Sequence, residues 1–380
     1  MKPTSFDTKV VHYKQDQTEV QNSKRTPIYQ TSAFTFKDLD HLESYYEGAS
    51  PYLYSRERNP NTDELAGTVA ELEGAPAGVA TSSGMSAILA GILGTAKPGD
   101  HIIAAEDLYG GTHSLITKEL ATFGIEVTML DFTDLEGVKA AIREETKLLY
   151  TESISNPFLR VENMERLAEL AQSHGIRTMV DNTFATPYLL QPYSMGIDLI
   201  VHSGTKYIGG HSDATCGVLV GDADLIQAAA KKVVTLGANL SPFEAWLTQR
   251  GAKTLGLRMK KQSENAKQVA EALRKHKGIA KVFYPEYVSE RGNGAIVTIE
   301  LNESVDVHAF FRSLGWIKIA PTLAGVETTL SYPIRTSHRA LSDAERLKIG
   351  VNDYVIRLSI GIEDSEDIIT QLTHSVEQAL

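Results

Sequence analysis

Lys206 is the side chain of this sequence that is best placed for covalent chemistry. It lies in the segment Ser203-Gly204-Thr205-Lys206-Tyr207, which follows an apolar run ending at Val201 and is rich in small and hydroxyl residues. Its neighbours differ from those of a solvated lysine on the exposed face of a helix. Enclosure among other positive groups lowers the pKa of a lysine and makes its amine a nucleophile toward carbonyl groups. The segment suits a lysine that bonds a carbonyl compound, with an ordinary loop lysine as the alternative.

Three further segments offer groups that bind charged partners. Ser82-Ser83-Gly84-Met85 is a strand-to-helix turn, whose backbone N–H groups suit a phosphate. Asp181 ends an apolar strand, where a carboxylate needs a partner, and Arg357 lies in an apolar strand, where it needs an anion. Taken singly, each has a structural alternative: a helix cap for the turn, a helix cap or salt bridge for Asp181, and an interdomain ion pair for Arg357. Taken together with Lys206, they suit pyridoxal phosphate acting on an amino acid.

The elements that must position these residues alternate regularly between about residues 62 and 240. Helical patterns separate several apolar runs, as at 64–72, 85–93 and 164–174. We expect strands over 77–80, 101–105, 125–130, 147–150, 177–180, 197–201 and 216–220. This alternation predicts an α/β fold whose mostly parallel sheet carries helices on both faces. Ligands of such sheets bind beyond the carboxyl ends of the strands, where the polar segments fall.

The chain divides into three expected regions. Residues 1–50 are polar and poorly periodic, and we interpret them as an arm that contacts a neighbouring subunit. Residues 51–240 form the large domain. Residues 241–380 are expected to form a smaller α+β domain, which opens with a capping box, Ser241-Pro242-Phe243-Glu244, and a long charged helix or helix pair to about residue 277. Strands are expected there near 295–301, 317–320 and 355–360.

Composition excludes several classes of function. The 380 residues carry 37 basic and 48 acidic side chains, a net charge of −11, which repels nucleic acid and anionic membranes. No run reaches the ~18 apolar residues of a membrane span. Cys216 is the single cysteine, so no intrachain disulfide forms, which fits a cytoplasmic protein. The histidines show no metal-ligand spacing, and we expect no metal site.

The order of several motifs resembles the Cys/Met-metabolism family of pyridoxal-phosphate enzymes. The motifs are Ser203-Gly204-Thr205-Lys206-Tyr207, Gly210-His211-Ser212-Asp213, Tyr54-Ser55-Arg56 and Asn59-Pro60. The similarity runs from Thr26-Pro27-Ile28-Tyr29-Gln30 to Arg357-Leu358-Ser359-Ile360-Gly361, almost the whole chain. The family contains cystathionine γ-synthases, cystathionine β- and γ-lyases, methionine γ-lyases and O-acylhomoserine sulfhydrylases. The resemblance implies fold type I, with a large pyridoxal-phosphate domain and a smaller C-terminal domain.

The resemblance also implies a role for each matched residue. Lys206 would form a Schiff base with the cofactor and shuttle protons, Asp181 would pair the pyridine nitrogen, and Tyr109 would stack on the ring and assist the leaving group. The other implied cofactor-binding residues are Ser83, Gly84, Met85, Thr183, Ser203 and Thr205, with Tyr54 and Arg56 reaching the neighbouring subunit's phosphate. The implied substrate-binding residues are Asn156, Thr322 and Arg357. The implied assembly is a homotetramer, a dimer of dimers with shared active sites.

Some positions depart from the family pattern. Cystathionine γ-lyases and γ-synthases usually carry arginine where this chain has Ser114 and glutamate where it has Pro321, and methionine γ-lyases usually carry cysteine at Gly111. Glu57 and Arg58 lie beside the expected entrance. We hypothesise that they replace the missing charges and bind the distal end of cystathionine. The alternative is a surface ion pair worth about 0 to 1 kcal/mol.

These observations predict a pyridoxal-phosphate C–S lyase of sulfur amino-acid metabolism. We favour cystathionine γ-lyase-type elimination over β-elimination. The nearest alternatives are γ-replacement, by a cystathionine γ-synthase or an O-acylhomoserine sulfhydrylase, and then methionine γ-lyase. Ser203-x-x-Lys206 also matches a motif of serine acyl-transferases, but the further motifs of that class are missing. A non-catalytic, regulatory pyridoxal-phosphate protein would be expected to lose Lys206 or Asp181, and both are present.

Overall fold

The computed structural model describes residues 5–13, 23–49, 51–339 and 342–380, and a seven-stranded sheet forms its centre. The strands lie in the order β1-β7-β6-β5-β4-β2-β3. β7 is antiparallel to both neighbours, and the remaining pairs are parallel. The predicted α/β fold with a mostly parallel sheet is therefore confirmed. Its strands are β1 (Ala77–Thr81), β2 (His101–Ala105), β3 (Glu126–Leu130), β4 (Thr146–Glu152), β5 (Arg177–Asp181), β6 (Leu199–His202) and β7 (Gly217–Gly221).

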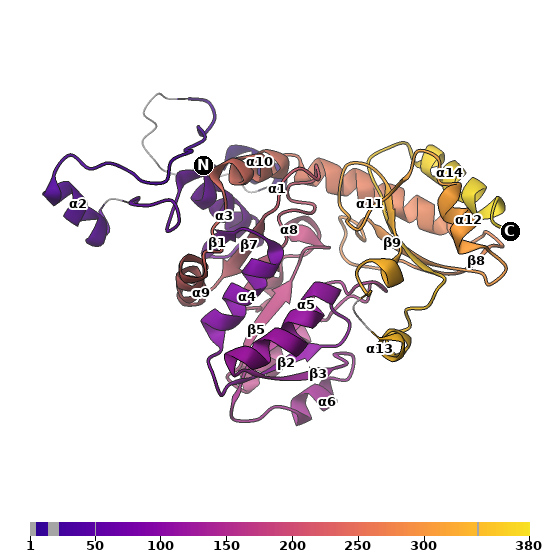
Figure 1. Ribbon diagram of the computed structural model, residues 1–380, viewed down its shortest axis with the longest axis horizontal. Helices are drawn as coiled ribbons and strands as arrows, with labels where there is room; N and C mark the ends of the chain where they lie inside the picture. The colour runs from indigo at the N-terminus through magenta and orange to yellow at the C-terminus, as the bar shows by residue number, and fades with distance from the viewer. Residues whose placement is uncertain (1–4, 14–22, 50, 340–341) are drawn as a thin grey trace.

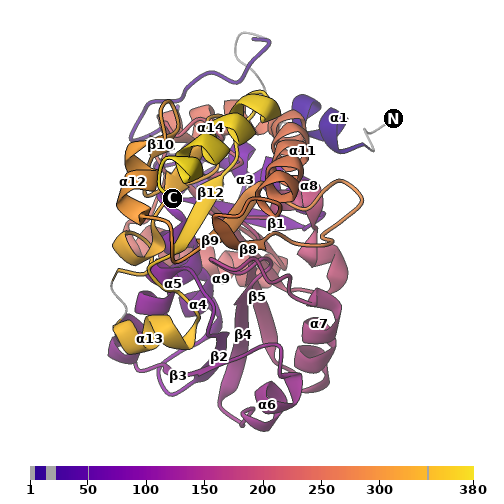
Figure 2. The same ribbon diagram turned by 90° about the vertical axis from the view of Figure 1, so that its right-hand side faces the viewer.

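Helices cover both faces of this sheet, because its central strands are apolar on both sides and need cover from water. Every residue of β2, β6 and β7 is buried. Figure 2 shows α4 and α5 on one side of the strands and α7 on the other. The helical segments of this part are α3 (Pro60–Glu73), α4 (Gly84–Thr95), α5 (Gly110–Ser114), η1 (Leu115–Glu119), η2 (Leu120–Phe123), α6 (Leu135–Ala140), α7 (Met164–Ser173), α8 (Thr186–Leu189), η3 (Pro192–Met195) and α9 (Ala223–Leu236).

A second, five-stranded sheet forms the C-terminal part of the chain, with the order β10-β11-β12-β9-β8. The sequence predicted three of these strands and missed β8 and β11. Its strands are β8 (Ile279–Phe283), β9 (Ile296–Leu301), β10 (Lys318–Ile319), β11 (Thr329–Ser331) and β12 (Val355–Ser359). The helical segments beside them are α12 (Val307–Arg312), η4 (Pro333–Arg335), α13 (Asp343–Lys348) and α14 (Ser365–Glu377).

Two helices, α10 (Pro242–Ala252) and α11 (Leu255–Leu273), join the two parts, and Figure 1 shows α11 running from one to the other. Met259 belongs to the hydrophobic core under the large sheet, whereas Ala266 belongs to the core of the second sheet. The change of core therefore falls within α11. The domain limits at 50 and 240 stay predictions.

The capping box expected at the start of α10 is wrong in its contacts. Ser241 occupies the N-cap position and proline follows it, as predicted, but the Ser241 side chain makes no capping hydrogen bond. The Glu244 carboxylate instead accepts the backbone N–H of Thr215, at 3.2 Å. A tertiary contact with the loop before β7 has replaced the local one.

The N-terminal segment contacts its own chain in one part and extends from it in another. In α1 (Phe6–His12), Phe6 and Val10 are buried in the large core. In α2 (Leu39–Tyr46) no residue is buried, and Figure 1 shows this helix away from the body of the molecule. Among the described residues, none of the helices has both the length and the apolar character that a bilayer span requires.

Arg258, on α11, fixes the backbone that follows Lys206. The residue is 5% exposed, and its guanidinium donates to the carbonyl oxygens of Tyr207, Ile208 and Gly251 at 2.6, 3.2 and 2.9 Å. Burial lowers the pKa of Arg258 to about 10, so the group stays charged at neutral pH. The loop of the lysine is thereby tied to the helix pair beneath it.

We expect Arg258→Met to lower the free energy of unfolding by about 2 to 4 kcal/mol, because several buried carbonyl groups lose their donor. Lys260→Met, at an exposed position of the same helix, is the matched control and should change it by less than about 0.5 kcal/mol. Urea denaturation followed by circular dichroism measures both. Equal effects of the two variants would contradict the assignment.

Candidate active site

A cavity of about 480 Å³ opens at the carboxyl ends of β4, β5 and β6. Strands of a parallel sheet end at one edge, so residues far apart in sequence meet there. Of the predicted site residues, the cavity wall contains Ser83, Gly84, Met85, Tyr109, Asn156, Asp181, Thr183, Ser203, Thr205, Lys206 and Arg357. Thr322 adjoins the wall residues Pro321 and Leu323. The structure therefore brings together most of the residues selected from the sequence.

Lys206 lies largely out of water in this cavity. Its ammonium Nζ donates a hydrogen bond to Oγ1 of Thr322 at 3.0 Å, and no hydrogen bond links it to Ser203 within the described residues. Burial, and secondarily the positive charge of Arg357, lower the pKa of Lys206 to about 8. An appreciable fraction of the amine is therefore neutral near physiological pH, as a nucleophile toward carbonyls requires.

The start of α4 forms one end of the cavity and suits a phosphate. Ser83 is the N-cap, and its Oγ accepts the N–H of Ser86 at 3.1 Å. A Cβ on Gly84 would lie only 2.9 Å from the Cβ of Ser203, so glycine permits this close approach. The Ser203 N–H donates to Oγ1 of Thr183 at 2.8 Å, which ties the segment after β6 to the segment after β5. Helix N–H groups and hydroxyls converge here, the donors that phosphate accepts from.

Asp181 offers a carboxylate inside the cavity that no basic side chain among the described residues pairs with. Its Oδ1 accepts the backbone N–H of Thr183 at 2.9 Å. Burial raises the pKa of Asp181, and hydrogen bonds from Thr183 partly oppose that effect. A protonated ring nitrogen beside the carboxylate would supply the missing positive charge. The donor set therefore fits the pyridine end of pyridoxal phosphate.

Arg357 and Asn156 form a carboxylate-binding pair from two different parts of the fold. Arg357, on β12, is 3% exposed, and its Nη1 donates to Oδ1 of Asn156 at 3.0 Å. Its Nε has no hydrogen-bond partner, and burial lowers the pKa of the guanidinium to about 10. A buried cation with a free donor fits a substrate carboxylate.

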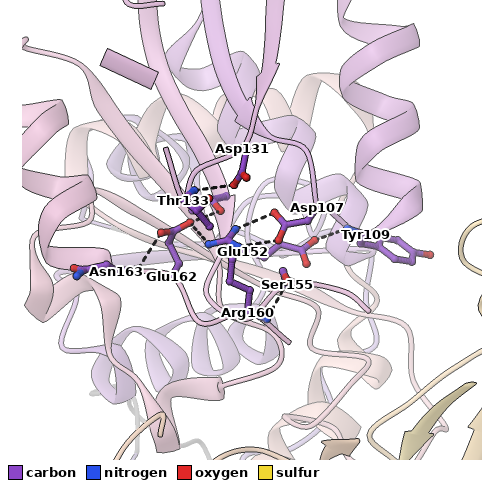
Figure 3. Close-up of polar contacts among 10 residues, drawn as sticks. Asp107, Tyr109, Asp131, Thr133, Glu152, Ser155, Arg160, Glu162 and Asn163 are labelled. Atoms are coloured by element: carbon purple, nitrogen blue, oxygen red, sulfur yellow. Dashed lines mark hydrogen bonds and ion pairs between the residues drawn. The ribbon is translucent and has the colours of Figure 1, made fainter. Parts of the chain in front are cut away.

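Glu152 is a cavity residue to which sequence analysis gave no role. Its Oε1 accepts the backbone N–H of Tyr109 at 2.7 Å, as Figure 3 shows. It stands opposite Asp181 in the register of β4 and β5. Burial, and secondarily the charge of Asp181, raise the pKa of Glu152 well above its usual range. Glu152 thus holds the backbone of the tyrosine whose ring lines the cavity.

An arginine clamp supports this arrangement from outside (Figure 3). Arg160 donates two hydrogen bonds of 2.9 Å to the carboxylate of Asp107 and one of 2.8 Å to Glu162. Asp107 lies two residues before Tyr109, and the Arg160 N–H donates to Ser155, next to Asn156. The clamp therefore ties the loop after β2 to the loop after β4. Sequence analysis did not select these clamp residues, and the signal that could have indicated them is a group of charged residues just after two strands.

Four of the predicted site residues lie outside this cavity: Tyr54 and Arg56, expected to reach a neighbouring subunit, and Glu57 and Arg58, expected beside the entrance. The Arg56 guanidinium stacks over the Tyr54 ring, 5.1 Å from its centroid. Arg58 pairs with Asp63 at 2.7 Å. Glu57 accepts the hydroxyl of Tyr45 at 2.5 Å. Their roles in cofactor or substrate binding stay predictions.

The cavity and the sheet beneath it define a pyridoxal-phosphate enzyme of fold type I. The family model described as Cys/Met metabolism PLP-dependent enzyme matches residues 7–377, and this chain belongs to that family. The chain is therefore a pyridoxal-phosphate-dependent enzyme that acts on the carbon–sulfur bonds of amino acids. The serine acyl-transferase and the non-catalytic alternatives are therefore wrong.

Similar proteins carry several activities of that family. A cystathionine β-lyase of Lactococcus lactis subsp. cremoris (strain MG1363) is 38% identical over 99% of this chain and its own full length. A cystathionine γ-lyase of Bacillus subtilis (strain 168) is 37% identical over 92% of this chain and 93% of its own. A solved structure from Campylobacter jejuni subsp. jejuni NCTC 11168, described as a putative O-acetylhomoserine (thiol)-lyase, is 31% identical with a TM-score of 0.92. The match covers 98% of this chain and 100% of that one, and the solved structure contains a pyridoxyl-lysine phosphate.

We expect Glu152→Gln to change the free energy of unfolding by less than about 1 kcal/mol, because the amide oxygen still accepts the Tyr109 N–H. Glu152→Leu leaves that N–H unpaired and should cost about 1 to 3 kcal/mol. Pyridoxal-phosphate affinity, measured from the visible absorption band, should fall only in the leucine variant. If glutamine were as damaging as leucine, the charge of Glu152 rather than its hydrogen bond would be needed.

Covalent capture of pyridoxal phosphate by the apoprotein should depend on pH with a midpoint near the Lys206 pKa of about 8. Below that pH the amine is protonated and cannot attack, so the rate rises with pH and then levels off. Arg357→Met removes a positive charge that lowers this pKa, and its midpoint should move to higher pH. The measurement is the rate at which the visible band appears. A midpoint that stays or falls in the variant contradicts the assignment.

Proposed function

We propose that the protein cleaves L-cystathionine by elimination. The proposal rests chiefly on one observation: the amine of Lys206 and the Arg357–Asn156 pair line the same cavity, close enough for Arg357 to lower the pKa of Lys206. An amino acid whose carboxylate binds Arg357 then has its α-carbon beside Lys206. The relatives named cystathionine β-lyase and cystathionine γ-lyase support the same substrate.

Each residue then has a distinct task in the reaction. Bound pyridoxal phosphate supplies a carbonyl group for the substrate amine and an electron-withdrawing ring. Arg357 and Asn156 bind the substrate carboxylate and orient the α-carbon. The neutral amine of Lys206 accepts the α-proton, and Asp181 keeps the ring nitrogen protonated. The hydroxyl of Tyr109, whose side chain is 44% exposed and faces the cavity, donates a proton to the departing sulfur.

The position of bond cleavage separates two lyases. Elimination at the γ-carbon converts cystathionine and water into cysteine, 2-oxobutanoate and ammonia, and we retain it as the expected outcome. Elimination at the β-carbon gives homocysteine, pyruvate and ammonia. A methionine γ-lyase is disfavoured, since a Cβ on Gly111 would lie 2.5 Å from the Tyr109 ring. γ-Replacement on an O-acylhomoserine is the second candidate, which the similar thiol-lyase structure supports.

The assembly we propose is a homotetramer in the cytoplasm, built from dimers that share active sites. No residue of α2 is buried, and Tyr54 and Arg56 lie outside the cavity of their own chain. Both observations support a neighbouring subunit that contacts these residues. The lone Cys216 is buried, and no described helix has the properties of a membrane span.

Incubation of the purified holoenzyme with L-cystathionine should release 2-oxobutanoate, identified by chromatography against pyruvate. Lys206→Ala should release neither, because it lacks the amine that accepts the α-proton. Pyruvate as the main product would assign β-elimination instead. If a protein with a visible cofactor band releases no keto acid, the lyase proposal is overturned. O-Acetyl-L-homoserine with a thiol would then be the next substrate to test.

A further inference from the structure

Arg335 is a cavity residue for which the proposed reaction has no task. It ends η4, its side chain is exposed, and it lines the cavity of Lys206 together with Thr336 and Ser337. Its guanidinium has no ion-pair partner within the part of the chain that the structure describes. Arg357 is buried in the depth of the cavity, whereas Arg335 lies where the cavity meets solvent.

The loop that carries Arg335 is held firmly by its neighbours. The backbone N–H groups of Arg335 and His338 donate to the carbonyls of Tyr332 and Pro333, each at 2.9 Å. The loop also packs against the start of α5, where a Cβ on Gly110 would overlap the carbonyl of Ser337. The guanidinium therefore extends from a fixed backbone beside the tyrosine of the site. A fixed backbone lowers the entropy lost when such a group binds a ligand.

The other positions considered for binding the far end of cystathionine are either uncharged or already in an ion pair. Pro321 lines the cavity and carries no charge, and Ser114 is neutral as well. Arg58 is engaged with Asp63 at 2.7 Å and lines a different cavity. Within one chain, Arg335 is thus the cation that remains available at the mouth of the described cavity.

We propose that Arg335 binds the distal carboxylate of the substrate and makes the enzyme prefer amino acids that end in an anionic group. This inference rests on the proposed function, since Arg357 must bind the α-carboxylate for the side chain to extend toward the mouth. The planar guanidinium can donate two parallel hydrogen bonds to a carboxylate. Substrates with a neutral tail lose these bonds, so Arg335 separates cystathionine from methionine and from O-acetylhomoserine.

The test compares the holoenzyme with Arg335→Ala and Arg335→Lys on three substrates. L-Cystathionine and O-succinyl-L-homoserine carry a distal carboxylate, and O-acetyl-L-homoserine does not. We expect Arg335→Ala to raise KM for the first two about 5- to 20-fold, with kcat and KM for the acetyl compound nearly unchanged. Arg335→Lys keeps the charge without the planar fork and should fall between. Arg339→Ala, exposed in the same loop region, is the matched control and should behave as the parent enzyme.

The possible outcomes separate this inference from the proposed function. A selective KM increase for both carboxylate-ended substrates supports the role of Arg335. An enzyme that cleaves cystathionine equally well with and without Arg335 keeps its function and overturns the inference. If Arg58→Ala instead gives the selective increase, a neighbouring subunit supplies the cation and the inference is wrong. If the parent enzyme does not cleave cystathionine, the proposed function fails. If Arg335→Ala changes KM equally for the succinyl and the acetyl compound, the inference is also overturned. The visible cofactor band should be equal in all variants, which excludes loss of folding as the cause.

Discussion

The burial of charged groups at one edge of the large sheet is the constraint on which the rest of the structure depends. Water is displaced there from an amine, a guanidinium and two carboxyl groups. Burial lowers the pKa of the two basic groups and raises the pKa of the two acids, so it favours the neutral form of each. These groups are Lys206, Arg357, Asp181 and Glu152. An unpaired buried charge is costly, so the edge must obtain partners from the surrounding chain and from bound molecules. Cofactor phosphate, ring nitrogen and substrate carboxylate have the complementary charges.

The two sheets depend on each other because the cavity is closed by bonds between them. Lys206 of the large part donates to Thr322, which precedes β11, and Arg357 of β12 donates to Asn156, which follows β4. α11 contributes to both hydrophobic cores, and Arg258 on that helix fixes the backbone after the lysine. A shift of one sheet relative to the other would separate the reacting amine from the carboxylate-binding pair.

The sequence predicted what depends on local pattern and missed what depends on long-range contact. Apolar runs identified all seven strands of the large sheet, and the motif around Lys206 indicated the chemistry. β8 was missed because Lys281 interrupts its apolar residues, and a charged, exposed position of this kind is typical of a strand at a sheet edge. Glu152 was missed because its partner, the N–H of Tyr109, lies 43 residues away. The capping box failed for the same reason, since Glu244 found a distant partner.

Depth in the cavity gives the two arginines different effects on recognition. Arg357 is withdrawn from water, so a carboxylate that reaches it must lose its own hydration and gains a strong, oriented interaction in return. Arg335 stays hydrated, and an ion pair in such a position contributes modestly to affinity. Its effect is on choice between tails, because every substrate of the family class offers the α-carboxylate and only some offer a second one. The deep guanidinium therefore selects amino acids as a class, and the one at the mouth distinguishes among them.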